Sequence, residues 1–224
     1  GQGVELGGAQ NELRQLIERA DIPAGCTLLG LSALPTDHPL NKGMLGMHGS
    51  LANSVKTQEC DVLIAVGMRF DDRITGKLST YACQAKKIHF EIDPSEINKN
   101  VPVDVAVLGD CKHTLAAVLE LVKPARHAEW VDSFGEHLER ESTTVIEPEI
   151  HPSEGPIKMG EVVRKVTEMT DNKAILVTDV GQNQMLAARY FKFMEGSSMV
   201  TSGGMGTMGL GLTAAIGATF GAPD

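Results

Sequence analysis

Four short, largely apolar runs most constrain what this chain can fold into. They have the composition of buried strands and lie at residues 26–31, 61–66, 87–92 and 103–108. Helix-type spacing of apolar residues occurs at residues 9–20, 51–57 and 112–122. Runs that are apolar throughout are typical of strands buried on both faces, and parallel strands need a crossover that is usually a helix. The pattern predicts an α/β fold with a doubly wound parallel sheet, a sheet type in which ligands sit beyond the carboxyl ends of the strands.

A second unit follows a proline-rich stretch. A polar amphipathic helix is expected before residue 142, and residues 143–156 contain three prolines and no clear periodicity. Beyond them, helices are expected at residues 157–169 and 184–190, strands at 174–178 and 199–201, and a last helical run near the end. We therefore expect a first domain over residues 1–142, a linker over 143–156, and a truncated second α/β domain over 157–224. Gly1 in place of a methionine and the abrupt last residues indicate that both ends are cut.

Composition excludes several classes of partner. The formal net charge is -9 without a basic cluster, which argues against nucleic-acid binding. The four cysteines lack the spacing of a structural zinc site and are expected to be free thiols in a reducing cytoplasm. No apolar run approaches the roughly 20 residues of a membrane helix, so we expect no membrane association.

Loops after the expected strands of the first domain carry glycine and charge. Residues 43–50, GMLGMHGS, could approach a flat or phosphorylated ligand, or could be a tight turn with its methionines in the core. Residues 67–76, GMRFDDRITG, could bind an anion through arginine or form a structural ion-pair cluster. Acidic residues after later strands fit a dinucleotide site, although no GxGxxG fingerprint is present.

Two loops of the second unit are similar candidates. Residues 178–184, TDVGQNQ, lie between a strand and a helix, where backbone amides can receive phosphate oxygens. Residues 202–211, SGGMGTMGLG, hold five glycines in ten positions, which fits either a flexible turn or a backbone that something approaches closely. Neither loop contains a nucleophile with its base, so the chemistry would be that of a cofactor.

The motifs MLGMHG, RFDDR, DVGQNQM and SGGMGTMGLG, in this order and at these separations, resemble the catalytic (large) subunits of acetolactate synthase, also called acetohydroxyacid synthase. The resemblance covers essentially the whole chain. It implies a transferase of branched-chain amino-acid biosynthesis that decarboxylates pyruvate and passes the two-carbon unit to a second 2-ketoacid, pyruvate or 2-oxobutyrate. It also implies thiamine diphosphate, Mg²⁺ and FAD as cofactors. The chain would hold the flavin-binding middle domain and the start of the thiamine-diphosphate domain.

The resemblance also assigns residues. Flavin contacts would fall on Gly1, Gly3, Thr27, Leu28, Gly46, Met47, His48, Gly67, Arg69, Asp71, Arg73, Glu91, Ile92, Gly109 and Asp110. Thiamine-diphosphate contacts would fall on Val180, Gly181, Gln182, Asn183, Gly206 and Met208. No catalytic residue and no metal ligand is expected within the chain. Asn183 stands where many members have histidine, and Thr213 replaces a common proline.

Further expectations concern the whole enzyme. A homodimer or homotetramer is implied, with room for a regulatory subunit, and the 224-residue chain alone is expected to be inactive and need not bind any cofactor. The strand that should precede Gly1 is missing. Two alternatives stay open: another thiamine-diphosphate decarboxylase or carboligase, and a stand-alone nucleotide-binding module.

Overall fold

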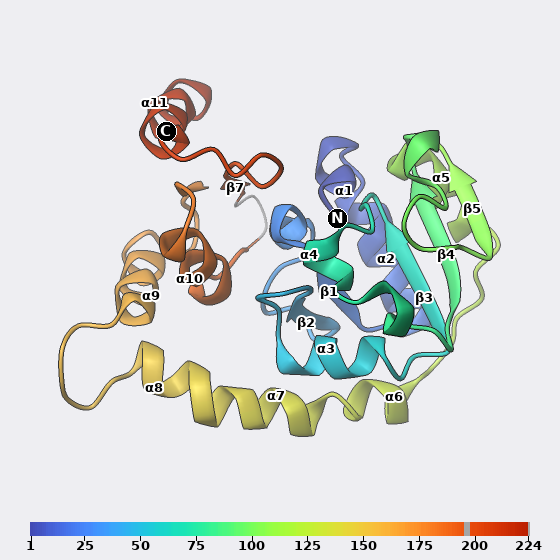
Figure 1. Ribbon diagram of the computed structural model, residues 1–224, viewed down its shortest axis with the longest axis horizontal. Helices are drawn as coiled ribbons and strands as arrows, with labels where there is room; N and C mark the ends of the chain where they lie inside the picture. Colours follow the sequence, from blue (N-terminus) through green and yellow to red (C-terminus); the bar gives the residue numbers. More distant parts are fainter. Residues whose placement is uncertain (195–197, 224) are drawn as a thin grey trace.

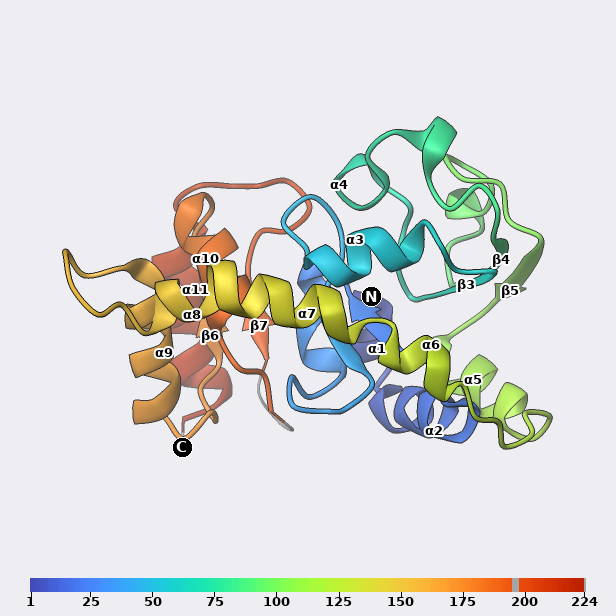
Figure 2. The ribbon, with the colours of Figure 1, turned by 90° about the horizontal axis from the view of Figure 1, so that it is seen from below.

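The computed structural model describes residues 1–194 and 198–223, so Asp224, the last residue of the expected second domain, lies outside the described residues. Figure 1 shows two groups of strands and helices. The N-terminal group contains β1 to β5, and the other group contains α9, α10 and α11. A row of helices, α6 to α8, runs beneath both groups, and Figure 2 shows it from below.

Every strand pair of the described residues is parallel. β3 (Val62–Val66), β4 (Lys86–Glu91) and β5 (Val105–Leu108) form one sheet, in the order β3-β4-β5, which we call the central sheet. β1 (Ala24–Cys26) pairs with β2 (Asn41–Met44) in a second sheet. The prediction of an α/β fold with parallel strands is confirmed, and the strands are divided among separate small sheets.

Apolar side chains pack against both faces of the central sheet, because successive side chains of a strand point to opposite faces. Val66 packs in one apolar cluster with Leu16 and Leu115, whereas its neighbour Ala65 packs in another with Phe70. The first cluster brings two helices onto the sheet, α2 (Gln10–Ala20) and α5 (Cys111–Leu119). The other short helices of this part are α1 (Gln2–Leu6), η1 (Leu28–Ala33), α3 (Leu51–Thr57), α4 (Asp72–Thr75), η2 (Leu78–Thr80) and η3 (Pro94–Glu96).

The strand predicted at residues 26–31 is wrong beyond Cys26. The chain turns into the 3-10 helix η1, in which the Gly30 nitrogen donates to the Thr27 carbonyl at 2.9 Å. Gly30 also packs so closely on Gly1 that an added Cβ would lie 2.8 Å from the Gly1 Cα. Short apolar runs do not distinguish strand from helix, and here tertiary packing decides. Strand β2 was not predicted, since its sequence NKGM has no apolar pattern.

The expected linker is partly helical. α6 (Ala128–Asp132) is followed after a two-residue turn by α7 (Gly135–Glu141), and the π-helical turn η4 (Ser142–Ile146) and α8 (Glu147–Ile150) continue α7 without a break. Glu141 is buried, accepts a hydrogen bond from the Leu51 nitrogen at 2.8 Å and pairs with Arg189. These contacts fix the row of helices to both groups, while the division into domains stays a prediction.

The remaining elements form what we call the C-terminal unit. They are α9 (Met159–Met169), β6 (Leu176–Val177), α10 (Gln182–Tyr190), β7 (Met199–Val200) and α11 (Leu210–Gly221), with β6 and β7 parallel. Each lies within or beside the segment predicted for it. Phe191 and Phe193 leave this unit and join the apolar cluster of Ile17 and Met44. The Phe193 carbonyl accepts from the Thr36 nitrogen at 2.7 Å, so the unit is anchored on the first part.

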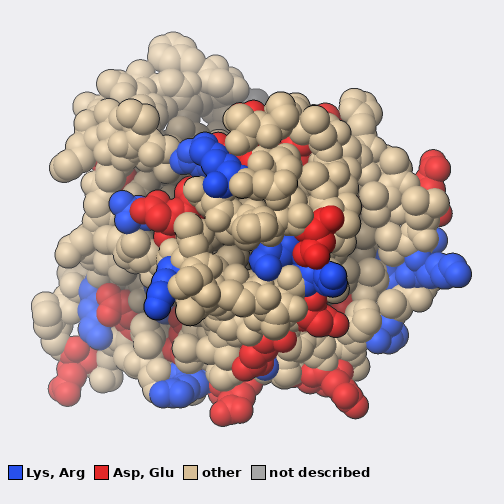
Figure 3. Space-filling model, turned by 45° about the vertical axis from the view of Figure 1, so that its right-hand side comes forward, with Lys and Arg blue, Asp and Glu red and all other residues tan. Residues whose placement is uncertain are grey.

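The surface of the C-terminal unit differs from the rest. In Figure 3 the face toward the viewer mixes acidic and basic side chains, whereas the lobe at upper left, where α11 lies in Figure 1, is uncharged. Leu212 and Phe220 of α11 are 74% and 83% exposed. Among the described residues, no helix combines the length and apolar character needed to cross a membrane.

Candidate functional site

Loops at the carboxyl ends of β3, β4 and β5 meet at one edge of the central sheet. The Gly67 nitrogen, just after β3, donates to the Phe90 carbonyl at 2.9 Å. The Gly109 nitrogen, just after β5, donates to the Glu91 carbonyl at 2.9 Å. Parallel sheets of this type bind ligands beyond the carboxyl ends of their strands. Three of the predicted flavin contacts, Gly67, Glu91 and Gly109, therefore lie together where a ligand would be expected.

The MLGMHG loop is fastened to the RFDDR loop. The Met47 nitrogen donates to the Arg73 carbonyl at 2.7 Å, and a Cβ added at Gly46 would lie 2.5 Å from that same oxygen. Gly46 also has φ +93°, so only glycine fits. The alternative of two core methionines holds for Met44, which is buried, but not for Met47, which is 59% exposed beside an exposed His48.

The RFDDR loop leaves its arginines accessible. Asp71 caps α4, because its Oδ1 accepts from the Arg73 nitrogen at 3.0 Å and the Ile74 nitrogen at 3.2 Å. Its other oxygen, Oδ2, lies 3.3 Å from the Arg69 Nε. The side chains of Arg69 and Arg73 are 54% and 71% exposed. The loop therefore presents two exposed guanidinium groups beside α4, and guanidinium groups can bind an anion.

The start of the chain lies at the same edge. The Gly3 nitrogen donates to the Gly67 carbonyl at 2.9 Å, and Gly1 packs on η1, which Thr27 precedes and Leu28 begins. A Cβ added at Gly3 would lie 2.7 Å from the Gly67 Cα. The backbone of the first residues therefore packs directly on the loop after β3 and on η1, without intervening side chains. This packing brings the four predicted flavin contacts at 1, 3, 27 and 28 close to the loop after β3.

Two of the three predicted acidic contacts, Glu91 and Asp110, are likewise engaged in local hydrogen bonds. Glu91 is buried, and its Oε1 accepts from the nitrogens of Ile92 at 2.9 Å and Asp93 at 3.2 Å. Asp110 caps α5 through the Lys112 nitrogen at 2.9 Å. Ile92, in contrast, is 65% exposed. These carboxylates fix the shape of their loops, and their remaining lone pairs are what a ligand hydroxyl could reach.

In the C-terminal unit, one carboxylate joins both candidate loops. Asp179 Oδ1 accepts from the Val180 nitrogen at 2.7 Å and the Gly209 nitrogen at 2.9 Å, while Oδ2 accepts from the Gly211 nitrogen at 3.2 Å. The Val180 and Gly209 hydrogen bonds lower the pKa of the Asp179 carboxyl. Asp179 is absent from the predicted site residues, although its place directly after a strand and before VGQNQ was a usable signal.

The predicted thiamine-diphosphate contacts all lie on the two loops that Asp179 joins. Gly181 precedes α10 with φ +121°, so Gln182 and Asn183 form the first turn of a nine-residue helix. Gly206 has φ +64° and lies opposite Val180, whose Cγ1 would be 4.0 Å from an added Cβ. Met208 is 78% exposed. The amides at the start of α10 therefore lie beside the glycine loop, and the start of a helix suits a phosphate group.

The two sets of predicted contacts come close through η1. A Cβ added at Gly203, in the glycine loop, would lie 2.7 Å from the Leu29 Cγ, one residue after Leu28. Among the described residues, no group of three or more His, Cys, Asp and Glu side chains could hold a metal ion. The chain thus presents two loop clusters side by side and no metal-ligand cluster in its described part.

Two family models match separate parts of the chain. The family model "Thiamine pyrophosphate enzyme, central domain" matches residues 1–118, and "Thiamine pyrophosphate enzyme, C-terminal TPP binding domain" matches residues 179–224. Thiamine pyrophosphate is another name for thiamine diphosphate.

Similar curated proteins carry one kind of name. The chain is 43% identical to an acetolactate synthase large subunit of Parasynechococcus marenigrum, 40% identical to a probable acetolactate synthase large subunit of Methanococcus aeolicus, and 40% identical to the acetolactate synthase isozyme 2 large subunit of Escherichia coli. Each alignment includes all of this chain, which spans 36%, 39% and 39% of those proteins, respectively. With its first 118 residues matched by the central-domain model, the chain belongs to the thiamine pyrophosphate enzyme family.

Proposed function

We propose that the chain is part of an acetolactate synthase large subunit, the enzyme that joins the two-carbon unit of pyruvate to a second 2-ketoacid. The observation that carries the proposal is the Asp179 carboxylate, which holds the 202–211 loop against the start of α10. The names of the similar proteins support the same activity. The domain limits 1–142 and 157–224, the cytoplasm as compartment, and a homodimer or homotetramer with room for a regulatory subunit belong to this proposal.

The loops of the C-terminal unit fit the diphosphate of thiamine diphosphate. A Cβ added at Gly181 would have no other atom within 4 Å. Glycine is therefore required there by the positive φ and not by lack of space. The amides of Gln182 and Asn183 would donate to diphosphate oxygens, and Val180, Gly206 and Met208 would line the thiamine side. When bound, thiamine diphosphate supplies the carbon nucleophile of 2-ketoacid decarboxylation. The chain's own residues orient the cofactor, and the described residues contain no cluster for its Mg²⁺.

The loops at the edge of the central sheet fit a flavin dinucleotide. The guanidinium groups of Arg69 and Arg73 would pair with its phosphates, and the exposed Met47 side chain would contact its flat ring. The glycines at 1, 3 and 67 allow the backbone segments at this edge to pack on one another. FAD would contact the residues from 1 to 110 assigned above.

Thiamine diphosphate binding can be measured by calorimetry with Mg²⁺ present. Gly181→Ala forces an L residue to φ +121° and is expected to weaken binding about tenfold or more, since such strain costs roughly 1–3 kcal/mol. Gly204→Ala is the matched control, because no positive φ and no neighbour within 4 Å constrains it. Equal affinity of both variants would contradict the proposed diphosphate loop.

Flavin binding can be followed by fluorescence quenching on titration with FAD. Arg73→Ala is expected to lower affinity about tenfold, the size of one charge-assisted contact. Lys77→Ala removes another exposed cation from the same segment and is expected to leave affinity unchanged. A loss of affinity in both variants would indicate general charge attraction and not a site at Arg73.

The activity itself is tested on the full-length protein that contains these residues. Steady formation of acetolactate from pyruvate, dependent on thiamine diphosphate, is the expected result. Release of acetaldehyde without acetolactate would favour a decarboxylase of the same family. Cofactor-independent nucleotide binding without turnover would favour the stand-alone module instead.

A further inference from the structure

His89 is a polar side chain in the middle of the central sheet. It lies on β4 between Ala65 of β3 and Ala106 of β5, and its side chain is 0% exposed. Among the described residues, its buried Nδ1 has no hydrogen-bond partner. A buried polar atom without a partner costs stability, and an apolar side chain of similar volume would avoid that cost. Core stability alone therefore does not account for a histidine at this position.

The other ring nitrogen of His89 bonds to the loop after β3. His89 Nε2 lies 2.7 Å from the Met68 carbonyl oxygen. Because a carbonyl oxygen can only accept, Nε2 is the nitrogen that carries the proton and donates it to Met68. The Glu91 Oε2 lies 3.7 Å from the same nitrogen, which is too far for a hydrogen bond. His89 thus connects the interior of β4 to the backbone of the RFDDR loop.

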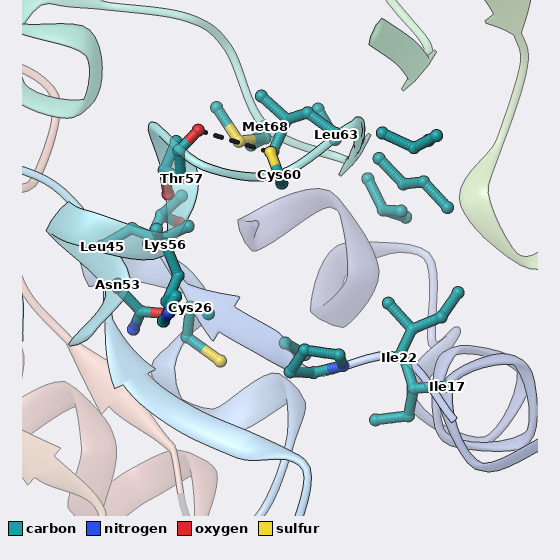
Figure 4. Close-up of a pocket in the computed structure, with 18 of the residues that line it drawn as sticks. Ile17, Ile22, Cys26, Leu45, Asn53, Lys56, Thr57, Cys60, Leu63 and Met68 are labelled. Carbon is teal, nitrogen blue, oxygen red and sulfur yellow. Dashed lines mark hydrogen bonds between the residues drawn. The ribbon is translucent and has the colours of Figure 1, made fainter. Parts of the chain in front are cut away.

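The imidazole ring also packs on Phe70 of this loop. The ring centroids of Phe70 and His89 lie 4.9 Å apart at an interplanar angle of 60°, which is an edge contact. Phe70 is buried in an apolar cluster, and Met68 packs against the same cluster. Figure 4 shows the Met68 side chain beside Cys60 and Leu63. Met68 and Phe70 are therefore both held toward the interior.

Arg69 lies between these two held residues and points the other way. Along the loop, Met68 is half-buried, Arg69 is exposed and Phe70 is buried. A guanidinium group whose two neighbouring residues are fixed has less freedom to lose when it binds an anion. The contacts of His89 thus bear on the direction in which Arg69 presents its charge.

We propose that His89 is a positioning residue for the flavin site. By donating to the Met68 carbonyl and packing on Phe70, it holds the loop in the shape that presents Arg69 to the phosphates of FAD. Because its side chain is fully buried, His89 acts through the loop and not by contact with the ligand. The inference rests on the proposed flavin site and is independent of the reaction that the enzyme catalyses.

The first test compares two substitutions by amide exchange. His89→Leu has a similar volume but no donor, whereas His89→Gln keeps an N–H group near the position of Nε2. His89→Leu is expected to speed exchange of the Met47 amide about tenfold, because this amide bonds to the Arg73 carbonyl of the same loop. His89→Gln should keep the parent rate within about threefold. Exchange of Gly109, whose amide bonds to the Glu91 carbonyl, should not change in either variant.

The second test measures FAD affinity by fluorescence quenching on the full-length protein that contains these residues. His89→Leu is expected to weaken binding about tenfold, and His89→Gln by less than about twofold. If His89 acts through Arg69, the two losses do not add. In an Arg69→Ala background, His89→Leu should therefore weaken binding by less than about twofold.

Tyr81→Leu is the matched control for packing. The Tyr81 ring also packs on Phe70, with centroids 6.1 Å apart, so this variant weakens the cluster while the Met68 carbonyl keeps its donor. Its unfolding temperature should fall by about 5 °C, with Met47 exchange and FAD affinity at their parent values. His89→Leu should shift the unfolding temperature by less than about 3 °C, because it removes an unpaired nitrogen and the loop can expose the Met68 carbonyl to water.

The inference is supported if His89→Leu changes both exchange and affinity while His89→Gln and Tyr81→Leu change neither. It is overturned if His89→Gln behaves like His89→Leu, since the hydrogen bond would then be irrelevant. Equal loss of affinity in Tyr81→Leu, or full additivity with Arg69→Ala, also overturns it. A parent protein that binds no FAD contradicts the proposed flavin site itself. The exchange rates, which need no ligand, then decide separately whether His89 holds the loop.

Discussion

The central sheet and the C-terminal unit are both parallel α/β arrangements, yet different interactions maintain them. β3 and β4 pair in register over five residues, and their apolar clusters include residues of α2 and α5 in one case and loop residues such as Phe70 and Tyr81 in the other. β6 and β7 pair over two residues, and α11 has no buried residue. The central sheet is thus stabilised by its own interior. The C-terminal unit depends on two phenylalanines set into the first part and on the Asp179 carboxylate.

The anchoring of the C-terminal unit can be broken at Phe193. This side chain is 1% exposed, and Phe193→Ala is expected to lower the free energy of unfolding by about 3–5 kcal/mol through lost burial and a cavity. Urea denaturation monitors the change. The control is Phe220→Ala on α11, 83% exposed, with an expected effect within about 0.5 kcal/mol. A Phe193→Ala variant as stable as its control would show that the unit does not depend on this contact.

The same contrast explains what the sequence could predict. β3 and β4 were predicted within a residue because their β-rich, largely apolar runs end at glycine or at charge. The run at residues 26–31 failed because Gly30 packs on Gly1, a contact between distant parts of the chain. The role of Asp179 was missed for a similar reason, since its partners at Gly209 and Gly211 lie about thirty residues away. The local sequence pattern therefore predicts helices and strands, whereas the contacts that close a loop depend on residues that are far apart in the sequence.

Glycine substitutions sharpen the comparison between the two loop clusters. A Cβ at Gly67, φ +57°, would lie 2.8 Å from the Gly3 Cα and 2.9 Å from the Cys111 Sγ. Gly209 has φ +91° but nothing within 4 Å. Gly67→Ala is therefore expected to destabilise by about 3 kcal/mol, from strain plus overpacking, and Gly209→Ala by about 1 kcal/mol, from strain alone. Gly76→Ala, also at φ +57° but in open space, isolates the strain at the same φ.

Thermal or urea unfolding of these three variants gives the ranking. Gly67→Ala should be the least stable, and the other two should resemble each other. If all three lose equal stability, close backbone approach contributes nothing at the edge of the central sheet, and the two loop clusters do not differ in the way proposed.

The smallest effect is expected at Asp179, where the readout is local order and not global stability. Its pKa is lowered from the usual 3.8 by backbone donors, so its contribution is present above about pH 3.8 and is lost as pH falls through the depressed folded value. Asp179→Asn keeps one acceptor and loses the charge. Amide exchange of Gly209 and Gly211 should therefore quicken in this variant at pH 7, and in the parent chain only below pH 3.8.

Asp104 provides the matched carboxylate in the central sheet. It accepts from the Lys87 nitrogen at 2.8 Å, and the backbone bond from the Asp104 nitrogen to the Lys87 carbonyl at 2.9 Å joins the same two residues. Its pKa is also lowered, chiefly by the Lys87 donor. Because the strand register holds this segment independently, Asp104→Asn is expected to leave exchange of the Lys87 amide nearly unchanged. Equal loss of protection in the two variants would mean that the central sheet relies on single carboxylates as much as the C-terminal unit does.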